Sequence, residues 1–150
     1  MRLFRAILIM LLLAGCSGMS KDWGVGFMQG VRDVPQRDFT PQEEEAALEA
    51  KAHFEKPFQA ELEKKLAEND LSNLKGWLVV FSFFSDGNLK TANVWVYTYW
   101  GQEQRYRVYS VPLKSFMDKT QLPTIAEASA QEVASLLLRK AAAEQQKTVD

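Results

Sequence analysis

Apolar residues in the first half of the chain recur at helical spacing. Between residues 40 and 69 they follow three- and four-residue steps with Glu and Lys between them, which is the pattern of a helix with one buried face. Thr40, Pro41 and Glu43 form a helix start, with a capping hydroxyl, a first-turn proline and an acid that closes a capping box. The apolar stripe consists of Ala47, Ala50, Phe54, Phe58, Leu62 and Leu66. Pro57 interrupts this stripe and either kinks one long helix or begins a second one, and we expect two helical segments.

The centre of the chain has the pattern of β-strands. Residues 77–84, 91–100 and 104–111 are rich in aromatic and β-branched side chains, and turn residues separate them. They are predicted to form a three-stranded antiparallel meander. A two-residue turn at 86–87 or at 87–88 places alternate residues of the first two strands on one face, which we expect the helices to cover. The residues of this face are Trp77, Val79, Phe81, Phe83, Ala92, Val94, Val96 and Trp100.

The opposite face of the predicted sheet is mixed in character. Its residues are Leu78, Val80, Ser82, Phe84, Asn93, Trp95, Tyr97 and Tyr99. Trp95, Tyr97 and Tyr99 are candidates for a binding surface, because aromatic side chains are favoured at interfaces. The alternative is a second core layer beneath the C-terminal helix. Whether Arg105 and Arg107 join this face depends on whether the turn before them has an even or an odd number of residues, which the sequence leaves open.

The last part of the chain predicts one more helix. Two capping boxes are candidates for its start, one at Thr124 with Glu127 and one at Ser129 with Glu132, after an irregular piece at residues 113–123. The apolar stripe of this helix is Val133, Leu136, Leu137 and Ala141. The fold class is therefore α+β: two N-terminal helical segments, a three-stranded antiparallel meander and a C-terminal helix, with the helices on one face of the sheet.

The first residues have the layout of a secretory signal. Arg2 and Arg5 precede an apolar run over residues 6–13. This run is too short to cross a bilayer as a helix, which needs roughly 20 apolar residues.

Leu13-Ala14-Gly15-Cys16 ends this segment and resembles the lipobox of bacterial lipoproteins. The resemblance implies that the Cys16 sulfur receives a diacylglyceryl group, that the peptide bond before it is cut, and that in Gram-negative bacteria the new amine takes a third acyl chain such as palmitate. Two or more chains hold a protein stably on a membrane. Ser17, in place of the aspartate of the family's inner-membrane retention signal, implies sorting to the outer membrane. The alternatives are an ordinary cleaved signal and an uncleaved anchor.

The predicted organisation has three parts. Residues 1–15 are a lipoprotein signal peptide, 16–39 the lipidated cysteine with a flexible tether, and 40–150 a single α+β domain. Glycines break any helix or strand pattern in the tether, and packing of this stretch back on the domain is the alternative. With 18 basic and 19 acidic residues the chain has no basic excess, so nucleic acid is not an expected partner.

Residues suited to catalysis or metal binding are scarce. The sequence has one histidine, His53, and its one cysteine, Cys16, would be consumed by the anchor. Neither a Ser-His-Asp nor a Cys-His arrangement can be completed in the usual way, and a structural zinc site needs four Cys or His ligands. We therefore expect no enzyme, no metal and no cofactor.

Two non-enzymatic functions remain. The first is a protein-interaction or accessory module of the outer membrane, held by acylated Cys16 on the periplasmic side rather than the cell surface, that docks on another envelope protein. The second is a ligand-binding module for a glycan, a peptidoglycan fragment or a lipid, with the arginines as anion or cation–π partners. The candidate binding face for both is Trp95, Tyr97, Tyr99, Arg105 and Arg107.

The lipid anchor predicts the behaviour of a single variant. Cys16→Ser should accumulate as unprocessed precursor without a lipid label, measured by gel mobility and by incorporation of labelled fatty acid in cells. Ser17→Ala, one residue further along, is the matched control and should keep both processing and label. A processed and labelled Cys16→Ser protein would exclude lipidation at this residue.

Overall fold

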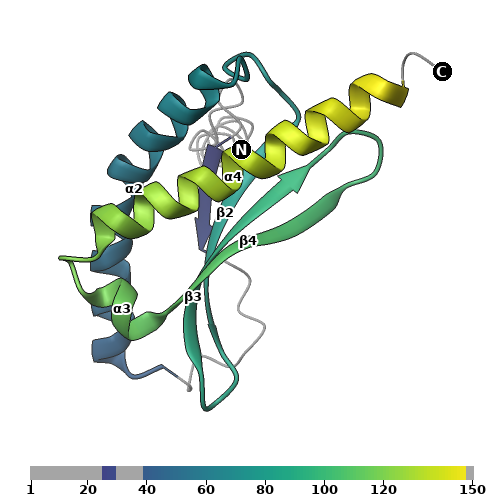
Figure 1. Ribbon diagram of the computed structural model, residues 1–150. Helices are drawn as coiled ribbons and strands as arrows, with labels where there is room; N and C mark the ends of the chain where they lie inside the picture. Colours follow the sequence, from purple (N-terminus) through teal and green to yellow (C-terminus); the bar gives the residue numbers. More distant parts are fainter. Residues whose placement is uncertain (1–24, 30–38, 148–150) are drawn as a thin grey trace, which may run out of the picture.

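The structure is a computed structural model that describes residues 25–29 and 39–147. Its elements are β1 (Val25–Gln29), α2 (Pro41–Glu68), β2 (Trp77–Ser85), β3 (Lys90–Thr98), β4 (Gln104–Pro112), α3 (Leu113–Met117) and α4 (Leu122–Lys147). The strands form one sheet in the order β1-β2-β3-β4, and α2 and α4 lie across one face of it (Figure 1). The described residues therefore form two layers, which confirms the predicted α+β class.

Helix α2 runs without a break from Pro41 to Glu68, although Pro57 lies inside it. A proline within a helix costs about 3 kcal/mol or more. Phe54 and Phe58 flank it and are both fully buried, and burying a phenylalanine contributes roughly 1.5–3 kcal/mol. Burial on both sides of Pro57 offsets the lost hydrogen bond, so one helix stands where two segments were predicted.

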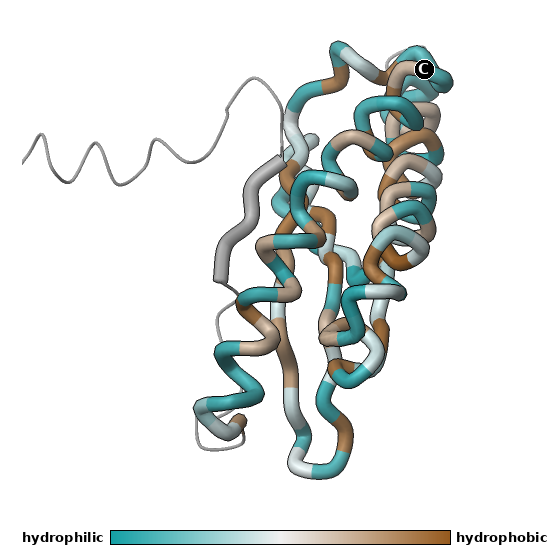
Figure 2. The backbone as a smooth tube through the Cα atoms, turned by 90° about the vertical axis from the view of Figure 1, so that its left-hand side faces the viewer, coloured by the Kyte–Doolittle hydropathy of each residue, from teal (hydrophilic) through white to brown (hydrophobic). Residues whose placement is uncertain are grey.

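Both long helices have a buried stripe and a polar outer side. In Figure 2 hydrophobic and hydrophilic residues alternate along each of them. The predicted stripe of α2 is confirmed, since Ala47, Ala50, Phe54, Phe58, Leu62 and Leu66 are all buried. Periodicity alone was enough to identify this face.

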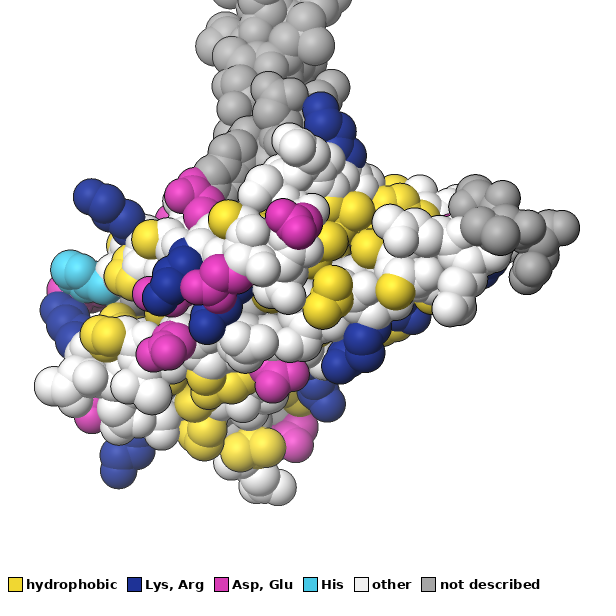
Figure 3. All heavy atoms as spheres, turned by 45° about the horizontal axis from the view of Figure 1, so that its top comes forward, with side chains coloured by type: hydrophobic (Ala, Val, Ile, Leu, Met, Phe, Trp, Pro, Cys, Tyr) yellow, Lys and Arg dark blue, Asp and Glu magenta, His cyan; other side chains and the backbone are white. Residues whose placement is uncertain are grey.

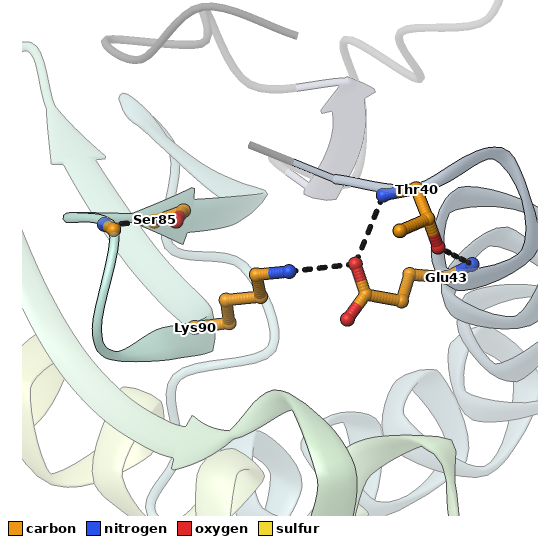
Figure 4. A network of polar contacts seen from close by, with 5 residues as sticks. Thr40, Glu43, Ser85 and Lys90 are labelled. Atoms are coloured by element: carbon orange, nitrogen blue, oxygen red, sulfur yellow. Dashed lines mark hydrogen bonds and ion pairs between the residues drawn. The ribbon is translucent and has the colours of Figure 1, made fainter. Parts of the chain in front are cut away.

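The first turn of α2 is tied to the sheet through one carboxylate (Figure 4). The Glu43 N–H donates to Thr40 Oγ1 at 3.1 Å, and the Thr40 N–H donates to Glu43 Oε2 at 2.9 Å, which is the predicted capping box. Lys90 Nζ at the start of β3 donates to the same Oε2 at 2.6 Å. The bonds from Lys90 and Thr40 hold the pKa of Glu43 below its usual value, so the carboxylate stays charged and joins the two elements.

Aromatic rings fill the space between the helices and the sheet. The phenylalanine cluster comprises Phe54, Phe58, Phe81, Phe83 and Phe116. Ring centroids are 5.2 Å apart for Phe54 and Phe58, 5.5 Å for Phe54 and Phe81, and 5.0 Å for Phe81 and Phe116. These distances are typical of favourable aromatic contacts. The cluster therefore joins α2, β2 and α3 at one point.

Strands β2 and β3 pair in the predicted register. Trp77 lies opposite Thr98 and Ser85 opposite Lys90, and the Asp86 N–H donates to the Leu89 carbonyl at 3.2 Å across the turn. This register corresponds to the turn at residues 87–88. It confirms the helix-covered face, whose members Trp77, Val79, Phe81, Ala92, Val94 and Val96 belong to the buried core, with Phe83 and Trp100 partly buried against it.

Strand β4 contains a bulge that the sequence pattern did not predict. Val94 lies opposite Tyr109, but Trp95 lies opposite Arg107, so Val108 is an extra residue on β4. The bulge changes which residues share a face, because side chains alternate along a regular strand. Tyr109 consequently points to the helix side, where it packs partly buried against the core, while Arg107 points to the other side.

Strand β1 lies within the stretch for which a flexible tether was the first interpretation. It pairs in parallel with β2, with Val25 opposite Val79 and Gln29 opposite Phe81 and an irregular register between them. For these five residues the structure therefore agrees with the alternative expectation, in which this stretch packs back on the domain. The signal peptide of residues 1–15 and Cys16 lie outside the described residues.

The C-terminal helix begins earlier than either predicted start. Inside the piece expected to be irregular, α3 forms a short helix, and α4 starts at Leu122. The Asp118 carboxylate accepts hydrogen bonds from the Thr120 N–H, the Thr120 hydroxyl and Gln121 Nε2, which lower its pKa and order the turn before α4. Ser129 is not a cap, because its hydroxyl donates to the Ile125 carbonyl at 2.6 Å inside the helix.

Two glycines with nearly equal positive φ angles provide a test of packing just before β2. Gly76 has φ 81° and Gly101 φ 82°, but an added Cβ at Gly76 would lie 2.6 Å from Trp100 Nε1, whereas at Gly101 it meets nothing within 4 Å. That indole nitrogen donates to the Lys75 carbonyl at 2.7 Å. Both alanine variants should lose about 1 kcal/mol through backbone strain. Gly76→Ala should lose about 1 kcal/mol more through the displaced indole. Equal losses in urea unfolding would contradict this role of Trp100.

Candidate functional site

The β3–β4 register places the candidate site residues on one surface. Arg107 lies opposite Trp95 and Arg105 opposite Tyr97, so both arginines are on the same face as these aromatic residues. The sequence had left this open, because it did not fix the length of the turn between β3 and β4. Tyr99 follows β3, and its N–H donates to the Gly76 carbonyl at 2.8 Å, which continues the alternation of the strand. We call Trp95, Tyr97, Tyr99, Arg105 and Arg107 the outer cluster.

The outer cluster lies on the side of the sheet away from the helices. The core that α2, α3 and α4 form with the sheet contains Trp77, Val79 and Phe81, which point to the opposite side. Trp95 and Tyr97 are half-buried, Tyr99 is 46% exposed, and both arginines are exposed. The alternative of a second core layer beneath the C-terminal helix is therefore wrong, because α4 packs on the other face.

Trp95 is held in place by contacts to both neighbouring strands. Its Nε1–H donates to Ser82 Oγ on β2 at 3.0 Å, so the indole leans across that strand. The Arg107 guanidinium of β4 lies 5.9 Å from the centroid of the Trp95 ring, within the range of a cation–π contact. The orientation of the indole is consequently set by contacts within the protein.

Tyr99 carries a neutral phenol at the end of the cluster. Partial burial, with the nearby Glu103 carboxylate and Tyr97, raises the pKa of its hydroxyl above the usual value. The hydroxyl therefore stays protonated at neutral pH and is able both to donate and to accept a hydrogen bond.

Asn93 is a polar residue of this face that the sequence analysis did not single out as a site. It is 1% exposed, and its Nδ2 donates to Thr91 Oγ1 at 3.2 Å, while its Oδ1 accepts no hydrogen bond in the described part of the chain. A buried acceptor without a donor costs about 1–3 kcal/mol. The signal that was available is an asparagine in mid-strand, where this residue type is depleted.

The remaining chemistry of the described residues is that of a solvated surface. His53 is 58% exposed and lies 3.9 Å from Glu49, whose carboxylate also accepts from Lys119 Nζ at 2.5 Å. No three His, Cys, Asp or Glu side chains come together as a possible metal site within residues 25–29 and 39–147. Acidic and basic side chains are interspersed over the end of the molecule that Figure 3 shows, without a large patch of one sign.

None of the helices in the described ranges is long and apolar enough to span a membrane.

Comparison with known proteins gives no further guidance. No protein-family model matches the chain, and no curated protein or solved structure matches it. The function is therefore inferred from the residues themselves.

The exposure of the outer cluster predicts how its aromatic residues tolerate truncation. The double variant Tyr97→Ala/Tyr99→Ala should stay folded, with a cooperative melting transition by circular dichroism. Phe81→Ala, a matched aromatic truncation on the buried side of β2, should lose about 3–5 kcal/mol of unfolding free energy. An unfolded tyrosine double variant would show that this face is part of the core.

Proposed function

We propose that this protein is a lipid-anchored, non-catalytic interaction module of the bacterial outer membrane. Acylated Cys16 would hold it on the periplasmic side, and the outer cluster would dock on another envelope protein. The anchor is supported by the lipobox-like Leu13-Ala14-Gly15-Cys16. The observation that carries the docking role is the accessible aromatic and arginine surface on the face of the sheet opposite to the helices.

The composition of the outer cluster suits protein recognition. Tryptophan, tyrosine and arginine are the residues most enriched among those that dominate binding energy at interfaces. Trp95 is already oriented by Ser82 and Arg107, so less side-chain freedom is lost when a partner binds. The sheet beneath is a rigid support, because its other face is packed against the core.

The carboxyl groups support a non-catalytic role. A general acid that works near neutral pH needs a raised pKa. The described carboxyl groups with a clear shift are Glu43, Glu49, Asp86 and Asp118, and in each the pKa is lowered by hydrogen bonds. They are held as carboxylates in structural ion pairs and turns, and none of these four has the raised pKa of a general acid.

The second candidate is recognition of a glycan, a peptidoglycan fragment or a lipid by the same face. Trp95 offers a flat aromatic surface beside the Arg107 cation. A sugar ring with hydroxyl groups and a nearby acid would match these groups. Protein docking is preferred, because the cluster is spread over neighbouring strands and Tyr99, Arg105 and Arg107 are exposed.

A photoreactive residue at position 99 tests the function in intact cells. We expect crosslinking followed by mass spectrometry to recover one envelope protein, because Tyr99 is the most exposed aromatic residue of the cluster. The same residue at Lys64, exposed on α2, is the matched control and should not recover that protein. Adducts only to glycan or lipid would favour the second candidate. No adduct from a folded and correctly localised protein would place the function elsewhere.

A further inference from the structure

Strand β4 is an edge of the sheet. The strand order ends at β4, and nothing within residues 25–29 and 39–147 adds a strand beyond it. It is also the most exposed of the three long strands, since none of its residues is fully buried. An edge strand presents unpaired N–H and C=O groups to which another strand can bind.

Two arginines mark this edge on the outer face. Arg105 and Arg107 are exposed and stand two residues apart, so their side chains leave the strand on the same side. Neither takes part in the ion pairs of the described residues. These two positive charges along one strand outnumber the nearby carboxylate of Glu103 and favour a negatively charged partner.

The opposite side of the same stretch is already occupied. Tyr106, between the two arginines, donates its hydroxyl proton to Gln104 Oε1, and the Lys140 ammonium of α4 lies 4.4 Å from the centroid of its ring. These contacts hold Tyr106 against the helix layer. The free recognition groups of this stretch are therefore those on the outer face.

Charges and bulges at an edge also protect it against unwanted pairing. On β4 this protection is selective. The bulge at Val108 separates residues 104–107 from residues 109–112, which end in a proline. The two arginines in the first stretch repel a basic segment and attract an acidic one. The arginines and the bulge disfavour pairing of β4 with a second copy of itself, but they allow an acidic strand to pair with residues 104–107.

We propose that the edge of β4 at residues 104–107 binds an extended acidic segment of a partner protein as an added strand. Backbone hydrogen bonds supply affinity, and acidic side chains at alternate positions of that segment meet Arg105 and Arg107. Trp95 and Tyr97 lie on β3, on the other side of β4 from the added strand, and stand behind the two arginines on the outer face. This inference rests on the proposed docking function and names the chemistry of its partner.

A peptide series tests this pairing on the full chain purified in a non-ionic detergent. The probe is a short capped peptide of alternating glutamate and valine, compared with a version that has lysine for glutamate. A third version carries N-methyl groups on alternate amide nitrogens, made in both possible registers, which blocks strand pairing and keeps the charge. Binding is measured by calorimetry and by backbone amide shifts in β4.

The acidic peptide should bind and shift the amides of residues 104–107, whereas the lysine peptide and one N-methylated register should not bind. Arg105→Ala/Arg107→Ala should weaken binding about tenfold, since each exposed ion pair contributes modestly. Arg139→Ala, an exposed arginine on α4, is the matched control and should bind normally. The charge reversal Arg105→Glu/Arg107→Glu should transfer binding to the lysine peptide.

Several results would overturn the pairing. Equal binding of both N-methylated registers would show that the arginines attract charge without an added strand. Arginine-dependent binding to phosphatidylglycerol vesicles, with no peptide binding, would assign the face to a lipid surface. No peptide binding, together with an envelope protein crosslinked at position 99, would remove the added strand and leave the proposed docking function standing.

Discussion

The packing of the phenylalanine cluster is the constraint on which the rest of the structure depends. The sequence has one cysteine, so no disulfide can join two parts of the chain, and the fold rests on close packing. Phe54 of α2, Phe81 of β2 and Phe116 of α3 come from distant parts of the sequence and meet within 5.0–5.5 Å. Because these contacts hold the helices on one side of the sheet, the other side is left for the outer cluster.

Much of this arrangement could be predicted from the sequence. The apolar stripe of α2 and the alternation in β2 and β3 are local patterns, and a strong turn at Gly87 sets the pairing of the two strands. The continuity of α2 through Pro57 could not be predicted, because it depends on Phe54 and Phe58 being buried on both sides. Strand β1 was missed for a related reason: glycine weakens a strand locally, and pairing with β2 overrides that preference.

The candidate site was predictable only in part. Trp95, Tyr97 and Tyr99 follow from alternation along one strand, whereas the position of Arg105 and Arg107 depends on a loop and a bulge that leave no periodic signal. The burial of Asn93 could not be predicted, because a single polar residue in a strand resembles an ordinary solvent-facing position. Its burial comes from the three-dimensional arrangement around it and from no feature of its immediate neighbours in sequence.

The bulge at Val108 divides β4 into two stretches in which the alternation of side chains between the two faces is reversed. Before it, residues at odd positions face the outer side, and after it residues at odd positions face the helices. A change of side chain at 105 or 107 therefore alters the outer surface of the sheet, and one at 109 or 111 alters what the helices pack against. The side chains at 105 and 107 can therefore change over evolution while Tyr106, Tyr109 and Val111 keep the core beneath the strand the same.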